Sequence, residues 1–291
     1  MKTENIITIV AAALAIAGAA SCQRELPYET AGQLNPITFT ADDCMGVSVT
    51  VTRSGVDPVE SLDVFEVTAT TGSSGSEVME WANATFSKVS GTELYTGGKM
   101  WPSMEVAYHF YASNSTLSFG TSGCTVSGDG TEDIVCAYLP ESEYNKQNSL
   151  AFNHIYARIG EVSIEAQTGY EISDVSISME CPVTGTYDIR TGAGKSDGTG
   201  WTPSSPEVRT LVSGANDQYV IPGEYVLKVS YKLTKDEWSE SFDKTAKVCI
   251  VGGMINIIKG TAIGGNASEV TFDVTVAEWD SRTVNVDWDA Q

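Results

Sequence analysis

The sequence predicts an all-β protein with two domains built as β-sandwiches or barrels, and three observations lead to this fold class. Apolar and polar residues alternate in many short segments, which is the pattern of half-buried strands, whereas helical periodicity is nearly absent. Val, Thr, Ile and Tyr are frequent, and 27 glycines supply turns between strands. The chain has 291 residues, which is more than one sandwich core accommodates comfortably.

Residues 1–21 have the features of a secretory signal peptide. A Lys near the start is followed by an apolar run at 6–20, shorter than the roughly 20 residues that span a bilayer. The small residues Ala-Ala-Ser then precede Cys22, which is the lipobox pattern. We therefore expect Cys22 to carry lipid, such as palmitate, and to become the mature N-terminus. The alternative is an ordinary signal peptide that happens to precede a Cys. Gln23 rather than Asp at the next position favours anchoring in the outer membrane.

After a linker at 22–36, the first domain is expected over residues 37–147. Alternation is strictest in its second segment, where Val47, Val49 and Val51 are separated by Ser and Thr. The expected strands of this domain are residues 37–40, 47–52, 62–67, 81–89, 106–112 and 134–138.

A polar stretch at 140–148 is the best candidate for a domain boundary, so the second domain is expected over residues 148–291. Residues 191–206 are rich in Gly, Ser and Pro and are expected to form a surface loop. The expected strands are residues 149–166, 172–179, 219–233, 246–251, 254–258 and 270–276. The expected core aromatic residues of the two domains are Phe110, Phe152, Tyr225 and Trp279.

The charge of the chain is strongly unbalanced. There are 38 acidic residues against 17 Lys and Arg, which gives a net charge of −21. Such a field repels nucleic acid and anionic lipid headgroups, so neither is an expected partner. It also keeps a crowded surface protein soluble before assembly.

Five cysteines follow Cys22, and export permits disulfide bonds between them. They are Cys44, Cys124, Cys136, Cys181 and Cys249. The odd number leaves at least one unpaired. Cys124 and Cys136 flank a turn-rich segment and could close a hairpin, or each could be a buried free thiol. No pair has metal-ligand spacing.

The candidate chemical motifs are weak, so we expect no enzymatic activity and no cofactor or metal. His109 and His154 each lie within an apolar strand, where a satisfied, half-buried side chain is more common than a catalytic one. Gly194, Lys195 and Ser196 resemble the end of a phosphate loop, but the required earlier glycine is absent and no βα unit surrounds them. An acidic turn at 129–133 lacks the spacing of a calcium loop.

The tryptophans could stack against sugar rings, although most lie in or beside strands. The six are Trp81, Trp101, Trp201, Trp238, Trp279 and Trp288. Trp81, Trp101 and Trp279 are expected in the core. Trp201 lies in the glycine-rich loop and is the candidate for contact with a ligand.

Several short motifs occur along the chain in a characteristic order. They are Pro36-Ile-Thr-Phe39-Thr, Thr52-Arg53-Ser54, Leu62-Asp-Val-Phe65-Glu-Val67, Met100-Trp101-Pro102 with Tyr108-His-Phe110-Tyr-Ala112, Leu150-Ala-Phe152-Asn-His154, Gly253-Met-Ile-Asn256-Ile, and Val270-Thr-Phe272 with Val276-Ala-Glu-Trp279. No single motif is specific, but the ordered set resembles the fimbrillin family, the type V pilins and Mfa-like lipoproteins of Bacteroidales. The resemblance covers nearly the whole chain.

The resemblance implies two sandwiches of transthyretin-like topology and assembly by donor-strand exchange. In polymerising members, a trypsin-like protease cuts after an Arg and removes the first strands, and a strand from a neighbouring subunit takes their place. Arg53 stands at the matching position, with Ser54 as the new N-terminus. Val47, Val49 and Val51 would occupy the groove until cleavage. Alternatively, Arg53 is an ordinary polar residue in a turn.

The C-terminal segment is shorter than expected for a long donor strand. Only twelve residues follow Trp279, with one short alternating stretch at 283–288, so a tip, anchor or accessory role competes with a stalk role. The leading expectation is a structural or accessory subunit of fimbriae, located at the cell outer membrane and cell surface. It would bind other fimbrial subunits by strand addition, and it could act as an adhesin for a host or bacterial surface ligand. The alternative is a monomeric glycan-binding lipoprotein.

Overall fold

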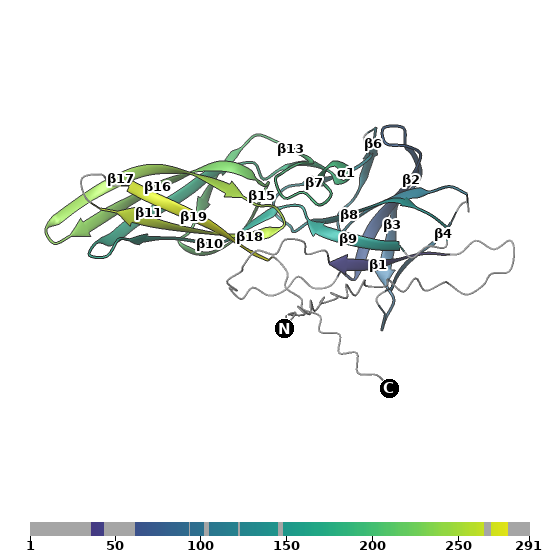
Figure 1. The fold of residues 1–291 in the computed structure, drawn as a ribbon, viewed down its shortest axis with the longest axis horizontal. Coiled ribbons are helices and arrows are strands. Elements are labelled where there is room, and N and C mark those ends of the chain that lie inside the picture. The colour runs from purple at the N-terminus through teal and green to yellow at the C-terminus, as the bar shows by residue number, and fades with distance from the viewer. Residues whose placement is uncertain are drawn as a thin grey trace, which may run out of the picture.

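A computed structural model of the chain describes residues 36–43, 62–92, 94–101, 105–121, 123–144, 148–264 and 269–278 (Figure 1). Strands make up almost all the regular structure of this part, and its helix, α1 (Ile189–Gly192), is a single turn. The predicted all-β fold class is therefore confirmed. No helix in the described ranges is long and apolar enough to cross a membrane. The described part is elongated, with a barrel at one end and a sandwich at the other (Figure 1).

The N-terminal half forms a closed barrel, in the order β1-β4-β3-β2-β5-β8-β9. Its strands are β1 (Pro36–Asp43), β2 (Val64–Thr71), β3 (Val78–Lys88), β4 (Leu94–Met100), β5 (Tyr108–Ser113), β8 (Val135–Ser142) and β9 (Asn148–His154). Neighbours are antiparallel except for β1 and β9, which run parallel.

Aromatic side chains fill the barrel. Phe110 and Phe152, both predicted core residues, are 0% and 5% exposed, and Trp101 is buried with them. Trp81 is partly buried against the same cluster. Burial alternates along β4 and β9, as expected for a barrel whose lumen is a packed core, whereas β5 is buried on both faces.

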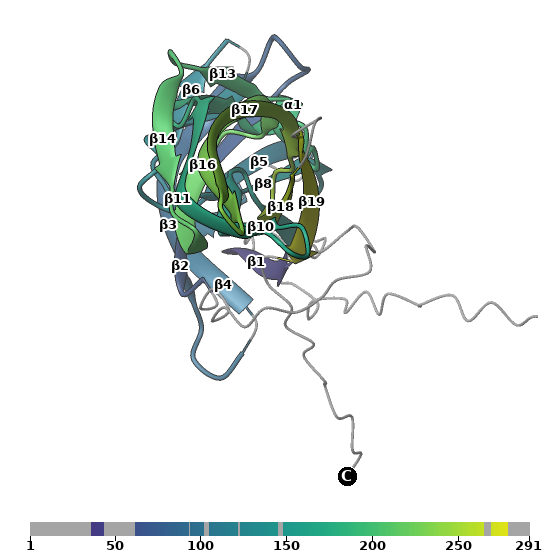
Figure 2. The same cartoon turned by 90° about the vertical axis from the view of Figure 1, so that its left-hand side faces the viewer.

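The C-terminal half is a sandwich of two four-stranded sheets, β15-β10-β18-β19 and β14-β11-β16-β17. Their strands are β10 (Ala157–Ala166), β11 (Glu171–Cys181), β14 (Glu207–Leu211), β15 (Gly214–Val220), β16 (Gly223–Lys235), β17 (Trp238–Ile250), β18 (Met254–Ile263) and β19 (Glu269–Glu278). Figure 2 shows the two sheets on opposite sides of their core. Leu227 and Met179 are fully buried there, while Tyr225 is only partly buried and Trp279 lies outside the described residues.

A third sheet, β13-β12-β7-β6, joins the two halves, and we call it the junction sheet. Its strands are β6 (Ser118–Gly120), β7 (Gly123–Gly128), β12 (Gly185–Asp188) and β13 (Trp201–Pro203). Beside it lies an apolar cluster with members from both halves, including Tyr111, Tyr156, Tyr187, Ile221 and Ile255. In Figure 1 the junction sheet and α1 lie between the barrel and the sandwich.

The segment predicted as one strand at 149–166 is two strands in different sheets. β9 ends at His154 and β10 begins at Ala157, and the two residues between them are buried. The Ile155 N–H donates to the Ile134 carbonyl at 3.0 Å, and the Tyr156 hydroxyl donates to the Val183 carbonyl at 2.8 Å. Sheet membership therefore changes after β9, rather than at the polar stretch before it. The division into two domains at 147/148 stays a prediction.

The described cysteines carry free thiols. Cys124 and Cys136, the candidates for a hairpin disulfide, are both buried and unpaired, as the alternative interpretation expected. Cys181 is also buried, whereas Cys249 is exposed on β17. Burial raises the pKa of the Cys124 and Cys136 thiols to about 12 and that of Cys181 to about 11.

These thiols should differ sharply in reactivity, because the thiolate is the form that is alkylated. At pH 8, iodoacetamide is expected to modify Cys249 in the folded protein and to leave Cys124, Cys136 and Cys181 unmodified until the chain is unfolded. Peptide mass spectrometry after native and denatured labelling measures this. Equal native labelling of Cys249 and Cys124 would contradict the described packing.

Candidate functional site: the strand that closes the barrel

β1 closes the barrel by lying between β4 and β9 (Figure 1). On one side it runs antiparallel to β4, with Phe39 opposite Tyr95 and a register shift between Pro36 and Thr38. On the other side it runs parallel to β9, and Phe39 to Asp43 lie opposite Asn148 to Phe152 in unbroken register. We call this position between β4 and β9 the β1 slot.

Each of the two strands beside the slot also pairs with a second strand of the barrel. Among the described residues, the ladder between β4 and β3 includes Thr96 and Tyr95 of β4, and that between β9 and β8 includes the last two residues of β9. The other edge of both strands pairs with β1. Withdrawing β1 would leave two open strand edges, and open edges bind extended chains.

Beneath the slot lies an aromatic floor centred on Phe65. The Phe65 ring is 4.9 Å from the Tyr95 ring on β4 and 5.0 Å from the Phe152 ring on β9, measured between centroids. All three side chains are at most 5% exposed, and the Tyr95 hydroxyl donates to the Leu62 carbonyl. One side chain thus supports both strands that flank β1.

Gly97 allows β4 to approach β3 closely. A Cβ at this position would lie 2.7 Å from both the Phe86 ring and the Thr85 carbonyl oxygen. The following residue, Gly98, has a positive φ of 66°, which favours glycine. The Gly-Gly pair therefore lets β4 pack closely against β3 next to the residues that pair with β1.

This arrangement supports binding of an extended strand rather than chemical catalysis. Each edge of the slot offers backbone donors and acceptors, and the floor offers an apolar surface for alternate side chains. The backbone groups and the apolar floor together would bind a strand in which apolar and polar side chains alternate.

Most predicted site residues lie outside the described part of the chain. These are Cys22, Val47, Val49, Val51, Arg53 and Ser54. The strand in the slot contains the first predicted segment, 37–40, and not the Val-rich one. Lipidation, processing and occupation of the slot by the Val-rich segment stay predictions.

Trp201 is half-buried against the junction cluster. Its ring centroid lies 4.8 Å from that of Tyr156 and 5.3 Å from that of Tyr187, and its Nε1 donates to the Ile155 carbonyl at 2.9 Å. Contact with a ligand stays a prediction for this residue. Among the described tryptophans, Trp238 is the more exposed, at 38%.

The histidines and the acidic turn have structural partners. His109 is within 3.0 Å of the Gly72 carbonyl oxygen and of the Tyr138 hydroxyl, and His154 Nδ1 lies 2.9 Å from the Asp133 carboxylate. Asp129 accepts hydrogen bonds from the Thr131 hydroxyl and backbone N–H, which lower the pKa of its carboxyl group. In the described ranges no three potential ligands are grouped so as to hold a metal ion.

Comparison with models of protein families shows which family the chain belongs to. The model of the fimbrillin-like family matches residues 50–279, which is most of the sequence. The chain belongs to the fimbrillin-like family. Family membership supports a fimbrial-type surface protein. A comparison with curated proteins gave no match.

Solved structures with partial similarity to this fimbrillin-like protein come from Bacteroidales. A candidate cell adhesion protein from Bacteroides ovatus is 15% identical, with a TM-score of 0.47 over 85% of this chain and 98% of that one. A fimbrial assembly protein from Parabacteroides distasonis is 10% identical, with a TM-score of 0.37 over 84% of this chain and 99% of that one.

Two features of the site were not predicted from the sequence of this fimbrillin-like protein. One is the pairing of β1 with both β4 and β9, and the other is the Phe65 floor. The Gly97-Gly98 pair was an available signal, because a glycine within a strand often marks close approach of another group. Nothing in the local pattern indicates which distant strands pair with residues 36–43.

Proposed function

We propose that this fimbrillin-like protein is a structural or accessory subunit of bacterial fimbriae that assembles by donor-strand exchange. Its partners would be other fimbrial subunits, each supplying an extended strand to the β1 slot of its neighbour. The observation that carries this proposal is the position of β1, which is the first described strand and completes the barrel by backbone pairing on both sides.

The proposed sequence of events begins at the outer membrane, where lipid on Cys22 anchors the chain at the cell surface. A protease then cuts after Arg53. The cut disconnects β1 from β2, which begins only at Val64, so that β1 is no longer covalently joined to the barrel. β1 can then be replaced by a strand that forms the same backbone hydrogen bonds with β4 and β9.

Limited trypsin digestion of the folded precursor tests the cleavage step. We expect an early fragment that begins at Ser54, and we expect Arg53→Ala to abolish that fragment and to prevent SDS-resistant polymers. Arg53→Lys, which trypsin also cuts, is the matched control. The digestion is run with and without reductant, because a disulfide at Cys44 would retain the released segment.

Unchanged cleavage and polymer formation in Arg53→Ala would overturn this mechanism. A protein that stays monomeric in both variants and binds a glycan array would instead support a monomeric glycan-binding lipoprotein, with Trp201 as the candidate for contact with the ligand.

A further inference from the structure

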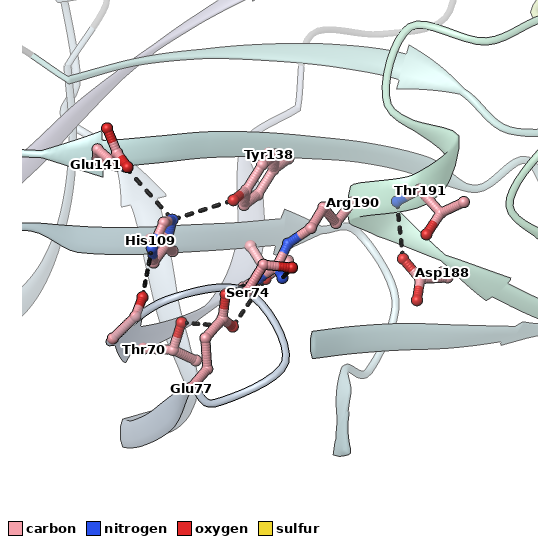
Figure 3. Close-up of polar contacts among 11 residues, drawn as sticks. Thr70, Ser74, Glu77, His109, Tyr138, Glu141, Asp188, Arg190 and Thr191 are labelled. Atoms are coloured by element: carbon pink, nitrogen blue, oxygen red, sulfur yellow. Dashed lines mark hydrogen bonds and ion pairs between the residues drawn. The ribbon is translucent and has the colours of Figure 1, made fainter. Parts of the chain in front are cut away.

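A buried ion pair connects the barrel to the C-terminal half. Glu77 ends the loop between β2 and β3, and Arg190 lies in α1, directly after β12 of the junction sheet. Arg190 Nη2 pairs with Glu77 Oε1, and the two side chains are only 16% and 3% exposed. Figure 3 shows Arg190 extending from the helical turn toward Glu77 and Ser74.

Both charged groups have additional partners. The Tyr111 hydroxyl lies 2.9 Å from Glu77 Oε2, and the Thr70 hydroxyl donates to the same oxygen at 2.9 Å. Arg190 Nη1 donates to the Ser74 hydroxyl at 2.7 Å, and Nη2 contacts the Tyr111 hydroxyl. The guanidinium also lies over two rings, 5.6 Å from the centroid of Tyr111 and 5.4 Å from that of Tyr138. The pair is thus held by directional contacts on several sides.

The elements that carry the pair are themselves braced. The loop is held at Gly72, whose carbonyl lies 3.0 Å from His109 Nε2, while Tyr138 contacts the other nitrogen of that ring (Figure 3). On the other side, the Asp188 side chain caps α1 by accepting from the Thr191 N–H at 2.8 Å. Neither partner can move far without breaking a second set of hydrogen bonds.

The junction sheet pairs β7 with β12 by backbone hydrogen bonds, but it contains no strand of the barrel, so the apolar contacts beside it leave the angle of the barrel weakly specified. The junction cluster attracts the barrel and the sandwich, but the hydrophobic effect is non-directional. A buried ion pair adds little net stability, because desolvation offsets the attraction, yet breaking it leaves an uncompensated charge. We therefore expect the ion pair to affect the relative orientation of the two halves more than the free energy of unfolding. Orientations that separate the two charges are disfavoured.

We propose that the Glu77–Arg190 pair fixes the orientation of the barrel relative to the C-terminal sandwich, so that both move as one rigid unit. The inference is independent of strand exchange, since it concerns contacts within one chain. In a fimbrial polymer, such a rigid unit would hold the β1 slot at a constant angle to the far end of the sandwich.

Pulsed electron–electron double resonance measures the distance between two spin labels, and labels on the two halves report on their relative orientation. One spin label is attached to the exposed Cys249 on β17 and a second to Ser90→Cys in the exposed turn between β3 and β4, with Cys22 and Cys44 replaced by Ala. The buried thiols stay unlabelled. We expect a single narrow distance distribution in the otherwise unchanged chain, and at least about a twofold broadening in Glu77→Gln and in Arg190→Met.

The matched control is a surface ion pair in the sandwich. Lys228 and Glu180 lie 3.6 Å apart with side chains 58% and 55% exposed, so Lys228→Met should leave the distribution unchanged. Hydrogen exchange gives a second readout: amides of residues 72–77 and 189–192 should exchange at least about tenfold faster in Arg190→Met, because breaking a buried pair frees its loop.

Two further variants keep the proposal testable if a single variant does not fold. The double variant Glu77→Gln with Arg190→Met leaves no uncompensated charge. Arg190→Lys keeps the charge but lacks the planar fork whose two nitrogens bond Glu77 and Ser74 separately. Each is expected to fold with a broadened distribution. A narrow, unshifted distribution in these variants, or in the single variants, would overturn the proposal and leave the strand-exchange mechanism untouched.

Discussion

Phe65→Ala is expected to destabilise the barrel by about 3–5 kcal/mol, the usual loss when a buried Phe is truncated in a core. The reason is specific to this site. The Phe65 ring is 1% exposed and contacts Tyr95 and Phe152, one on each strand beside β1. Urea denaturation followed by aromatic fluorescence measures the loss. We also expect faster release of β1 after cleavage at Arg53, because both edges of the slot lose their support.

Leu227→Ala is the matched control. Leu227 is fully buried in the sandwich core, so its truncation should cost a similar amount, about 2–5 kcal/mol, without changing the release of β1. If both variants released β1 equally fast, the effect would be general instability rather than loss of the slot floor. A loss below about 1 kcal/mol for Phe65→Ala would contradict the described packing.

Cys22→Ala is expected to abolish lipidation completely, since the thioether to the lipid cannot form without the thiol. The motivation is the small-residue triplet that precedes this Cys. Growth with an alkyne fatty acid, followed by fluorescent labelling of the purified protein, measures the modification. The variant should also accumulate as unprocessed precursor of higher mass.

Cys44→Ala separates the lipidation site from a general effect of losing a thiol. This variant should label at the normal level and be processed normally. Normal labelling of Cys22→Ala would show that the lipobox interpretation is wrong. The fimbrillin-like family membership would not be affected, because its match covers residues 50–279.

Local alternation was enough to predict many of the strands. Segments at 62–67, 106–112 and 254–258 overlap β2, β5 and β18. Alternating apolar residues located these strands, although β5 is buried on both faces and the other two are buried on both faces over part of their length. The same signal failed at 149–166. Alternation continues through the switch from β9 to β10, since both strands bury alternate residues, so periodicity alone does not reveal a change of sheet.

The junction between the halves was not predictable in the same way. Its strands β6, β12 and β13 have only 3, 4 and 3 residues, too few for a periodic signal, and β13 falls in a segment expected to be a loop. Glu77 and Arg190 lie in a polar loop and a single helical turn, where sequence alone suggests solvated charges. Only the tertiary fold brings these two residues together.

The candidate site was predicted in part. The resemblance to fimbrillins indicated that early strands fill a groove, and β1 does lie in the barrel at a seam between β4 and β9. The partners of β1 are about 60 and 110 residues away in sequence, and such long-range pairing has no local signature. Processing at Arg53 is part of the proposal, and occupation of the groove by Val47, Val49 and Val51 stays a prediction.

The most direct test of strand exchange is the N-terminal sequence of the protein purified from its native host. The proposed mechanism predicts that protein in SDS-resistant polymers begins at Ser54 and lacks residues 36–43. Polymers whose subunits begin at Cys22 and retain β1 would contradict it, because the β1 slot would then be occupied by the chain's own strand.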